Sequence, residues 1–145
     1  MNYSDALEFT HSLLKFGIKP GLERVSRLLS RLGDPQKDTK FIHVAGTNGK
    51  GSVCTYLSSI LTAHGYKTAM FTSPHLISMC ERFRIDGELM SEDDFMRYFY
   101  LVQTKVDEVR NYVGKVQESA GEKKVSKQIE VLPPDYHPTF FEYLF

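Results

Sequence analysis

Residues that could do chemistry gather in one short stretch of this 145-residue chain, Gly-Thr-Asn-Gly-Lys-Gly-Ser at residues 46–52. The apolar residues 41–45 precede it and predict a buried strand, and a helical pattern begins at Ser52. A glycine-rich turn between a strand and a helix lets several backbone N–H groups point into one concavity. The N-terminus of the helix adds a partial positive charge, so the stretch predicts a phosphate-binding loop.

Two side chains in this loop could complete a nucleotide site. Lys50 carries a charge that can reach the β- and γ-phosphates, and Ser52 falls where the hydroxyl ligand of nucleotide-bound Mg²⁺ is expected. The strict pattern G-x-x-x-x-G-K-[ST] does not match, because Val44 replaces its first glycine and Gly51 separates Lys50 from Ser52. The alternative is a glycine-rich turn with a solvated lysine. Three glycines between a strand pattern and a helix pattern favour ATP or GTP binding.

A second strand pattern follows the helix at residues 67–71. Strand, helix and strand in this length predict a βαβ unit over residues 41–72 with parallel strands. Ligands of such sheets bind beyond the carboxyl ends of the strands, so residues 72–76 should face the same crevice as the glycine loop. Ser73 could then ligate a hydrated metal or a phosphate oxygen, and His75 could contact a substrate. The alternative for Ser73 is the ordinary turn that a serine–proline pair makes at a strand end.

Composition argues against several classes of partner. Eighteen basic and eighteen acidic residues balance, whereas a protein that binds nucleic acid usually shows a basic excess. No apolar run approaches the roughly 20 residues of a membrane span, and the N-terminus lacks the regions of a signal peptide. Cys54 and Cys80 are isolated, which makes a reducing cytoplasm the simplest location. We therefore expect a cytoplasmic protein that binds neither nucleic acid nor membrane.

Local patterns predict the other elements. A helix capped by Ser4 should run to residue 16, and the next helix, over residues 22–32, carries arginines such as Arg24 on a face expected to be solvated. The dipeptide Asp86-Gly87 marks the turn of a hairpin. A long helix follows, with one apolar seam expected to pack against a core. The seam consists of Phe95, Phe99, Val102, Val106, Val109 and Val113.

The last residues predict a helix that starts at Thr139, because Thr139 and Glu142 have the spacing of a capping box. This helix begins in a run of apolar side chains, and a sheet of two or three strands is a poor core by itself. We therefore expect this chain to be a truncated part of a larger domain.

Five motifs resemble the bacterial folylpolyglutamate synthases and dihydrofolate synthases, which are relatives of the Mur ligases. They are Gly-Leu-Glu-Arg-Val (21–25), the run at 43–53, Thr-Ser-Pro-His-Leu (72–76), Glu-Arg-Phe-Arg-Ile-Asp-Gly (81–87) and Thr-Phe-Phe-Glu (139–142). The resemblance covers nearly the whole chain and includes Gly51, which breaks the generic loop pattern. It implies an α/β fold: the N-terminal part of a three-layer P-loop domain with a parallel sheet, like the central domain of Mur-type ligases, without the C-terminal domain.

Under this resemblance the chain divides into successive segments of one partial ATP-binding domain. They are a helical segment (1–40), the P-loop βαβ unit (41–72), a folate loop with the hairpin (73–90), the long helix (91–113), a polar surface loop (114–128) and a metal-ligand segment (129–145).

The resemblance implies an ATP-dependent, ADP-forming ligase. In this family a carboxylate of folate or dihydropteroate attacks the γ-phosphate of ATP, and the amine of L-glutamate attacks the resulting acyl phosphate. ATP and Mg²⁺ are the implied cofactors, and the missing C-terminal domain is an implied partner, so this chain alone is expected to lack ligase activity. Two alternatives stay open: an ATP- or phosphate-binding fragment without catalysis, and another Mur-type amide ligase. Members of the latter class typically have Gly-Lys-Thr without the intervening glycine.

The resemblance also implies roles for single residues. Lys50 looks like the catalytic contact to phosphate, and Ser73 and Glu142 look like Mg²⁺ ligands, with Ser52 beside them. Glu142 has a competing role as the capping partner of Thr139. The full phosphate cradle would consist of Gly46, Thr47, Asn48, Gly49, Lys50, Gly51 and Ser52, and the substrate contacts would be Gly17, Ile18, Lys19, Pro20 and His75.

Overall fold

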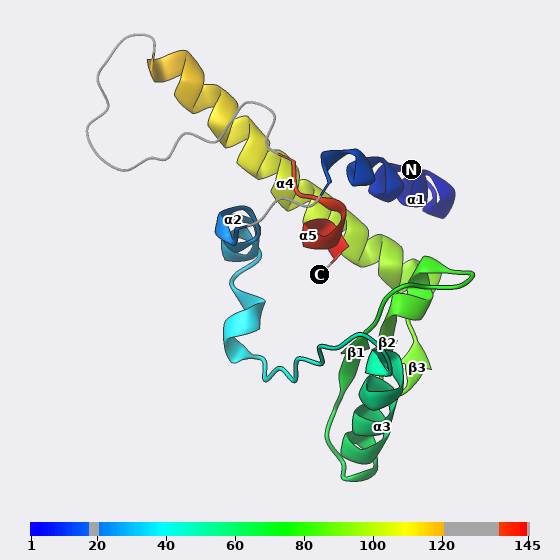
Figure 1. Cartoon of the computed structure of the whole chain (residues 1–145). Coiled ribbons are helices and arrows are strands. Elements are labelled where there is room, and N and C mark those ends of the chain that lie inside the picture. The colour runs from blue at the N-terminus through cyan, green and yellow to red at the C-terminus, as the bar shows by residue number, and fades with distance from the viewer. Residues whose placement is uncertain (18–20, 121–136, 145) are drawn as a thin grey trace. The chain divides into compact units, whose positions relative to one another are not determined.

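The chain separates into two compact units (Figure 1). The structure, a computed structural model, describes residues 1–17, 21–120 and 137–144, and its account of side chains leaves out 111–120. The first unit comprises Met1–Thr39 with Tyr98–Phe145, and the second comprises Lys40–Arg97.

Helices build the first unit. They are α1 (Tyr3–Ser12) with a 3₁₀ turn at Leu13–Phe16, α2 (Glu23–Arg31) with a 3₁₀ turn at Pro35–Asp38, the part of α4 (Glu92–Ala120) from Tyr98 onward, and α5 (Phe140–Leu144). The cap of α1 differs from the prediction. Asn2, not Ser4, accepts a hydrogen bond from the backbone N–H of Asp5, and the Asp5 carboxylate accepts one from the N–H of Asn2 in return. The helix therefore starts earlier than predicted, because Asn2 and Asp5 form a complete capping box.

An aromatic cluster holds the first unit together. The ring of Phe99 lies 5.7 Å from that of Phe9 and 5.6 Å from that of Tyr143, centroid to centroid. The Tyr143 hydroxyl donates to the carbonyl of Phe99 at 3.2 Å, so its one polar atom is paired inside the core. The predicted seam of α4 is confirmed for Phe95, Phe99, Val106 and Val109, which are buried. Val102 is half-buried, and the side chain of Val113 lies outside the described ones.

The long helix extends further than predicted. It runs to Ala120, so the predicted polar loop is wrong for residues 114–120, and the rest of that loop, 121–128, lies outside the described residues. Lysine, glutamine, glutamate and alanine are good helix formers, and a single glycine at position 114 costs only about 1 kcal/mol. The predicted strand near residue 129 also lies outside the described residues.

The second unit pairs α3 (Lys50–Ala63) with a small sheet. Its three strands, β1 (Ala69–Phe71), β2 (Phe83–Ile85) and β3 (Glu88–Leu89), follow the order β1-β2-β3 and both pairings are antiparallel. The predicted hairpin is confirmed: Ile85 pairs with Glu88 across a turn whose two residues, Asp86 and Gly87, have φ of 52° and 88°. Positive φ at both positions is the type I′ geometry that matches the twist of the strands.

The predicted parallel strand at residues 41–45 is not formed in the part of the chain that the structure describes. This segment has no sheet pairing there, and Phe41 and Ile42 are 63% and 64% exposed. A parallel strand needs neighbours from distant parts of a chain, and β1 pairs instead with the nearby β2. The mixed helix-and-sheet class was predicted correctly, but the βαβ pairing was wrong for these residues.

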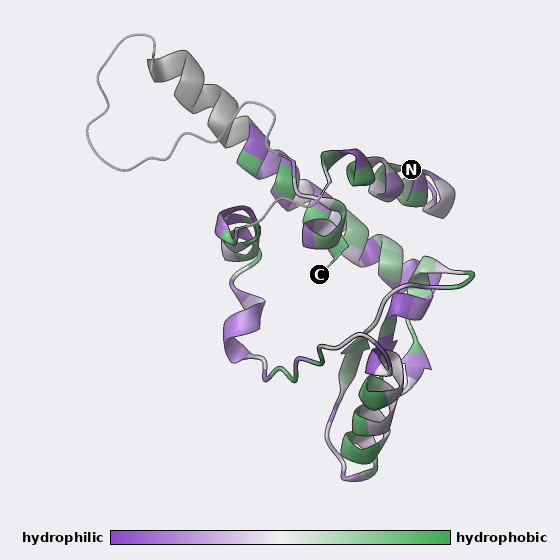
Figure 2. Cartoon of the chain, viewed as in Figure 1, coloured by the Kyte–Doolittle hydropathy of each residue, from purple (hydrophilic) through white to green (hydrophobic). Residues whose placement is uncertain are grey.

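Helix α3 has no buried residue, although hydrophobic residues recur along it (green in Figure 2). Val53, Tyr56 and Ile60 are exposed, whereas Leu57 and Leu61 are half-buried. None of the helices in the described ranges is both long and apolar enough to cross a membrane.

Candidate functional site

The glycine loop turns directly into α3. Gly49 is the N-cap of the helix with φ of 75°, a left-handed conformation that favours glycine, and Gly46 has φ of 153°. The helix begins at Lys50, two residues before the predicted start at Ser52. The first helical turn therefore carries the lysine and the serine of the predicted cradle.

Three backbone N–H groups at this helix start are available to a ligand. Within a helix the first donors have no intrahelical acceptor, and here the first such bond is from the N–H of Val53 to the carbonyl of Gly49, at 3.0 Å. The described residues provide no acceptor for the N–H groups of Lys50, Gly51 and Ser52, and no side chain caps the helix. Such N–H groups and the helix dipole are the features on which the prediction of an anion site at this loop depends.

The ammonium group of Lys50 is held over the loop. It donates to the carbonyl oxygens of Gly46 at 2.7 Å and of Thr47 at 3.0 Å. An ammonium has three donors, so one remains for an oxygen outside the loop. The other cradle residues, Thr47, Asn48, Gly51 and Ser52, are all exposed at the same loop.

Gly51 has no evident need to be a glycine within the described structure. It lacks a positive φ, and a Cβ built on it meets no described atom within 4 Å. Neither backbone conformation nor packing requires glycine here. A ligand that approaches the backbone closely is a remaining physical reason for it.

The second predicted part of the site, residues 72–76, lies in the loop after β1, and the Glu81 side chain binds the backbone of this loop. The Glu81 carboxylate accepts hydrogen bonds from the N–H groups of Leu76 at 2.9 Å, Ile77 at 2.8 Å and Ser78 at 2.7 Å. As a result Leu76 and Ile77 are fixed in place while their side chains are 90% and 94% exposed. Ser73 is exposed in the same loop, and the peptide bond after it is cis.

These bonds predict how the loop responds to acid. The N–H groups of Leu76, Ser78 and Ile77 lower the pKa of Glu81 from its ordinary value of 4.5 to about 2. Because the pKa is lower in the folded loop, this contribution to stability is complete above about pH 4.5 and is lost as the pH falls toward 2. Amide signals of Leu76 and Ile77 in an NMR titration should shift together near pH 2. In Glu81→Gln this transition should be absent, whereas in Glu88→Gln it should be unchanged; a transition that persists in Glu81→Gln would contradict the assignment.

His75 is oriented by Arg82. The Nε of Arg82, a buried side chain, donates to Nδ1 of His75 at 2.8 Å. With Nδ1 as the acceptor, a neutral His75 carries its proton on Nε2, which makes Nε2 a donor. The structure therefore fixes the tautomer of this predicted substrate contact.

Glu142, the predicted metal ligand, lies in the first unit and is bound by Arg24. The guanidinium makes two hydrogen bonds with the carboxylate, at 3.1 and 3.2 Å. The predicted capping box is confirmed as well: the N–H of Thr139 donates to Glu142 at 2.8 Å, and the N–H of Glu142 donates to the Thr139 hydroxyl at 3.4 Å. Burial raises the pKa of Glu142, but the hydrogen bonds from Arg24 and Thr139 outweigh it and the net shift is downward. An ionised carboxylate is the form that binds a metal.

The predicted metal donors suit Mg²⁺ in their chemistry. Ser52, Ser73 and Glu142 offer oxygen atoms, and Mg²⁺ binds proteins through one or two carboxylates while keeping water and phosphate oxygens. Among the described residues no three histidine, cysteine, aspartate or glutamate side chains gather as they would around a metal held by protein alone. Each of the three oxygen donors, taken singly, is of the type that Mg²⁺ binds. Ser52 and Ser73 belong to the second unit and Glu142 to the first.

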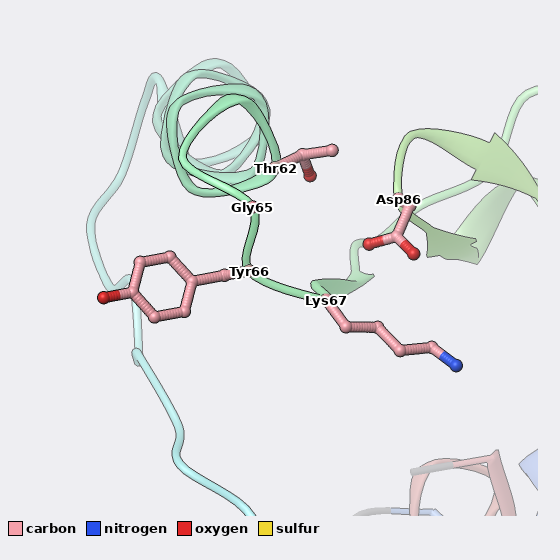
Figure 3. Close-up of a pocket in the computed structure, with 5 residues that line it drawn as sticks. All are labelled: Thr62, Gly65, Tyr66, Lys67 and Asp86. Atoms are coloured by element: carbon pink, nitrogen blue, oxygen red, sulfur yellow. The ribbon is translucent and has the colours of Figure 1, made fainter.

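One predicted part of the site, residues 17–20, lies mostly outside the described residues, and one pocket contains none of the predicted site residues. Of the predicted substrate contacts, Gly17 ends the first helical segment with φ of 64°, while Ile18, Lys19 and Pro20 lie outside the described residues. A pocket at the C-terminal end of α3 contains no predicted site residue (Figure 3). Its Asp86 carboxylate already accepts the N–H of Thr68 at 2.7 Å, so this group serves the hairpin.

The residues that sequence reasoning missed act on the predicted ones. Arg24 was expected on a solvated face, but its side chain is only 22% exposed and is paired with Glu142. Glu81 binds the backbone of the loop, and Arg82 orients His75. All three lie in motifs, at 21–25 and 81–87, that carry the family resemblance. Their location in these motifs was the sequence signal that could have identified them as functional residues.

No family model matches this chain, but individual known proteins resemble it in sequence and in structure. The dihydrofolate synthase/folylpolyglutamate synthase of Bacillus subtilis is 45% identical over 93 residues, which cover 64% of this chain and 22% of that protein. The solved folylpolyglutamate synthetase from Lactobacillus casei matches with a TM-score of 0.75 and 27% identity, over 99% of this chain and 31% of that one. A structure described as an FPGS–AMPPCP–folate complex matches with a TM-score of 0.70 and 26% identity, over 99% of this chain and 30% of that one.

The chain thus spans between 22% and 31% of the length of these relatives. The likeness in sequence and the likeness in fold point to the same group of proteins. In sequence and in fold, this chain is related to the folylpolyglutamate and dihydrofolate synthases.

Proposed function

We propose that this chain is the phosphate-binding part of an ATP-dependent, ADP-forming ligase that adds L-glutamate to a carboxylate of folate or dihydropteroate. The start of α3 is the observation that carries the proposal. It combines three N–H groups that have no acceptor among the described residues with a lysine ammonium that the loop carbonyls hold in place. Gly51 adds support, because its backbone is open to close approach.

The residues of this chain would act by binding and orienting. The N–H groups of Lys50, Gly51 and Ser52 would hold phosphate oxygens, and the free donor of Lys50 would neutralise charge that develops during phosphoryl transfer. When bound, Mg²⁺ would supply further neutralisation of the phosphate charge. Ser52, Ser73 and Glu142 are the residues proposed to hold it. His75, with its donor on Nε2, would contact the folate-type substrate.

A second candidate is a nucleotide-binding chain without catalysis of its own. The anion-binding groups at the start of α3 support it by themselves, because phosphate binding needs only these N–H groups and Lys50. Another Mur-type amide ligase is less favoured, because the relatives from Bacillus subtilis and Lactobacillus casei carry folate-related names. We place the reaction in the cytoplasm, on the basis of the two isolated cysteines.

The reaction can be tested with the complete protein that carries this chain. ADP should form only when ATP, L-glutamate and a folate-type acceptor are all present, and one glutamate should be joined for each ADP. Dihydropteroate and tetrahydrofolate are assayed in parallel to identify the acceptor. AMP as the product, or ADP formation that does not depend on glutamate, would contradict the proposed reaction. Nucleotide binding by the complete protein without any turnover would support the second candidate.

A further inference from the structure

Arg82, the last residue before β2, is a buried side chain that reaches into the loop after β1. It is 6% exposed, and its Nε donates to Nδ1 of His75 at 2.8 Å. A planar guanidinium donates along fixed directions, whereas the ammonium of a lysine rotates freely on a flexible stem. The bond therefore sets the rotation of the imidazole ring as well as its position.

The backbone is held on both sides of this bond. The carbonyl of Arg82 accepts the N–H of Thr72 at 3.0 Å, directly beside the pairing of β1 with β2. On the other side, the N–H of Leu76, the residue after His75, donates to the Glu81 carboxylate at 2.9 Å. Side chains keep a defined geometry when the elements that carry them are fixed. We therefore expect the His75 ring to keep one orientation.

The same bond determines what the far edge of the ring presents. Because Nδ1 accepts from Arg82, a neutral His75 carries its proton on Nε2, at the opposite edge. A group that meets Nε2 must then provide a hydrogen-bond acceptor. Folate and dihydropteroate both provide such atoms in their carbonyl and carboxylate oxygens.

We infer that Arg82 is a positioning residue for substrate binding, which holds the His75 ring so that Nε2–H donates to a carbonyl or carboxylate oxygen of the folate-type substrate. This inference rests on the proposed function, in which His75 contacts that substrate. Arg82 itself contacts neither substrate nor nucleotide in this arrangement, and its effect passes through His75. Both residues and the groups that support them belong to the second unit.

Two other roles of Arg82 predict different results. If Arg82 served only the packing of the loop, its removal would lower the free energy of unfolding but leave the His75 tautomer and the KM for the substrate unchanged. If Arg82 contacted the substrate directly, its removal would raise KM even in a protein that lacks His75. Tautomer, KM and stability, measured on the same variants, separate the three roles.

The first measurement is a long-range ¹H–¹⁵N NMR spectrum of the His75 ring in the labelled 145-residue chain, recorded at about pH 8, where imidazole is neutral. The wild-type chain should show the Nε2–H tautomer alone. Arg82→Met keeps a long apolar stem without a donor, so the Nδ1–H tautomer should appear beside it, and Arg82→Lys should show less of that form. Arg84→Lys is the matched control and should match the wild type, because Arg84 donates to the carbonyl of Gly87 instead.

The second measurement is the KM for the folate-type substrate in the complete protein. Loss of one oriented hydrogen bond in Arg82→Met should raise KM about fivefold. The kcat should stay unchanged, because the contact is made in the bound substrate and in the transition state alike. His75→Phe should raise KM by a similar factor, and the addition of Arg82→Met to it should raise KM no further. Arg84→Lys again serves as the control.

Circular dichroism and urea unfolding accompany each variant, and if Arg82→Met fails to fold, Arg82→Lys carries both comparisons. Three results would overturn the inference: an unchanged tautomer in the folded Arg82 variants, an unchanged KM in them, or a further rise in KM when Arg82→Met is added to His75→Phe. Failure of the proposed function is distinct, because the wild-type protein would then form no ADP from ATP, L-glutamate and a folate-type substrate. That result would remove the substrate contact of His75 as well, whatever tautomer the spectra show.

Discussion

Replacing Lys50 with alanine is expected to weaken ATP binding to this chain by about 100-fold. The substitution removes a charge-assisted contact worth up to about 3 kcal/mol, and each 1.4 kcal/mol changes affinity tenfold. It also removes the ammonium that is anchored to the carbonyls of Gly46 and Thr47. Isothermal titration calorimetry with Mg²⁺–ATP measures the effect.

The control for this prediction is Lys67→Ala, which removes an exposed lysine of the same unit outside the glycine loop. This variant should bind ATP as the wild type does. Because Lys50 is also exposed, the free energy of unfolding should be nearly the same in all three proteins. Equal ATP affinity in Lys50→Ala and Lys67→Ala would show that the loop does not hold the phosphates.

The largest effect on stability is expected from Phe99→Ala. Phe99 is 3% exposed and its ring contacts those of Phe9, Tyr100 and Tyr143. Truncation of a buried phenylalanine leaves a cavity and typically lowers the free energy of unfolding by about 3–5 kcal/mol. That loss is a large fraction of the roughly 5–15 kcal/mol that stabilises a typical domain. Urea unfolding followed by circular dichroism provides the measurement.

Two matched variants define the cause of this effect. Phe99→Leu keeps most of the buried volume and should cost less than half as much as Phe99→Ala. Tyr98→Ala, at the preceding and more exposed position of the same helix, should cost about 1 kcal/mol or less. If Phe99→Ala were no more destabilising than Tyr98→Ala, the aromatic cluster would not be the core of this unit.

Features encoded by neighbouring residues could be predicted from the sequence. The turn at Asp86 and Gly87, the capping box of Thr139 and Glu142, and the buried seam of α4 each follow from residue types at short spacing, and all three are confirmed. The glycine loop at the start of α3 belongs to the same group. Capping and turn geometry are local physics, which is why residue type and spacing were sufficient.

Features that depend on distant residues could not be predicted in the same way. The bonds between Arg24 and Glu142 join positions 118 apart, and helical periodicity alone placed Arg24 on a solvated face. Pairing of residues 41–45 also depends on distant strands, and the parallel arrangement predicted for it is absent from the described residues. Periodicity predicts which elements form, but partner choice follows from tertiary packing.

Phosphate binding by the N–H groups at the start of α3 is the central claim. Amide NMR spectra of the labelled chain, recorded with and without Mg²⁺–ATP, test it most directly. We expect the largest shifts on Gly49, Lys50, Gly51 and Ser52, with smaller changes elsewhere in the second unit. Shifts concentrated at the pocket around Tyr66 and Asp86, or no shifts in a folded chain, would contradict the claim.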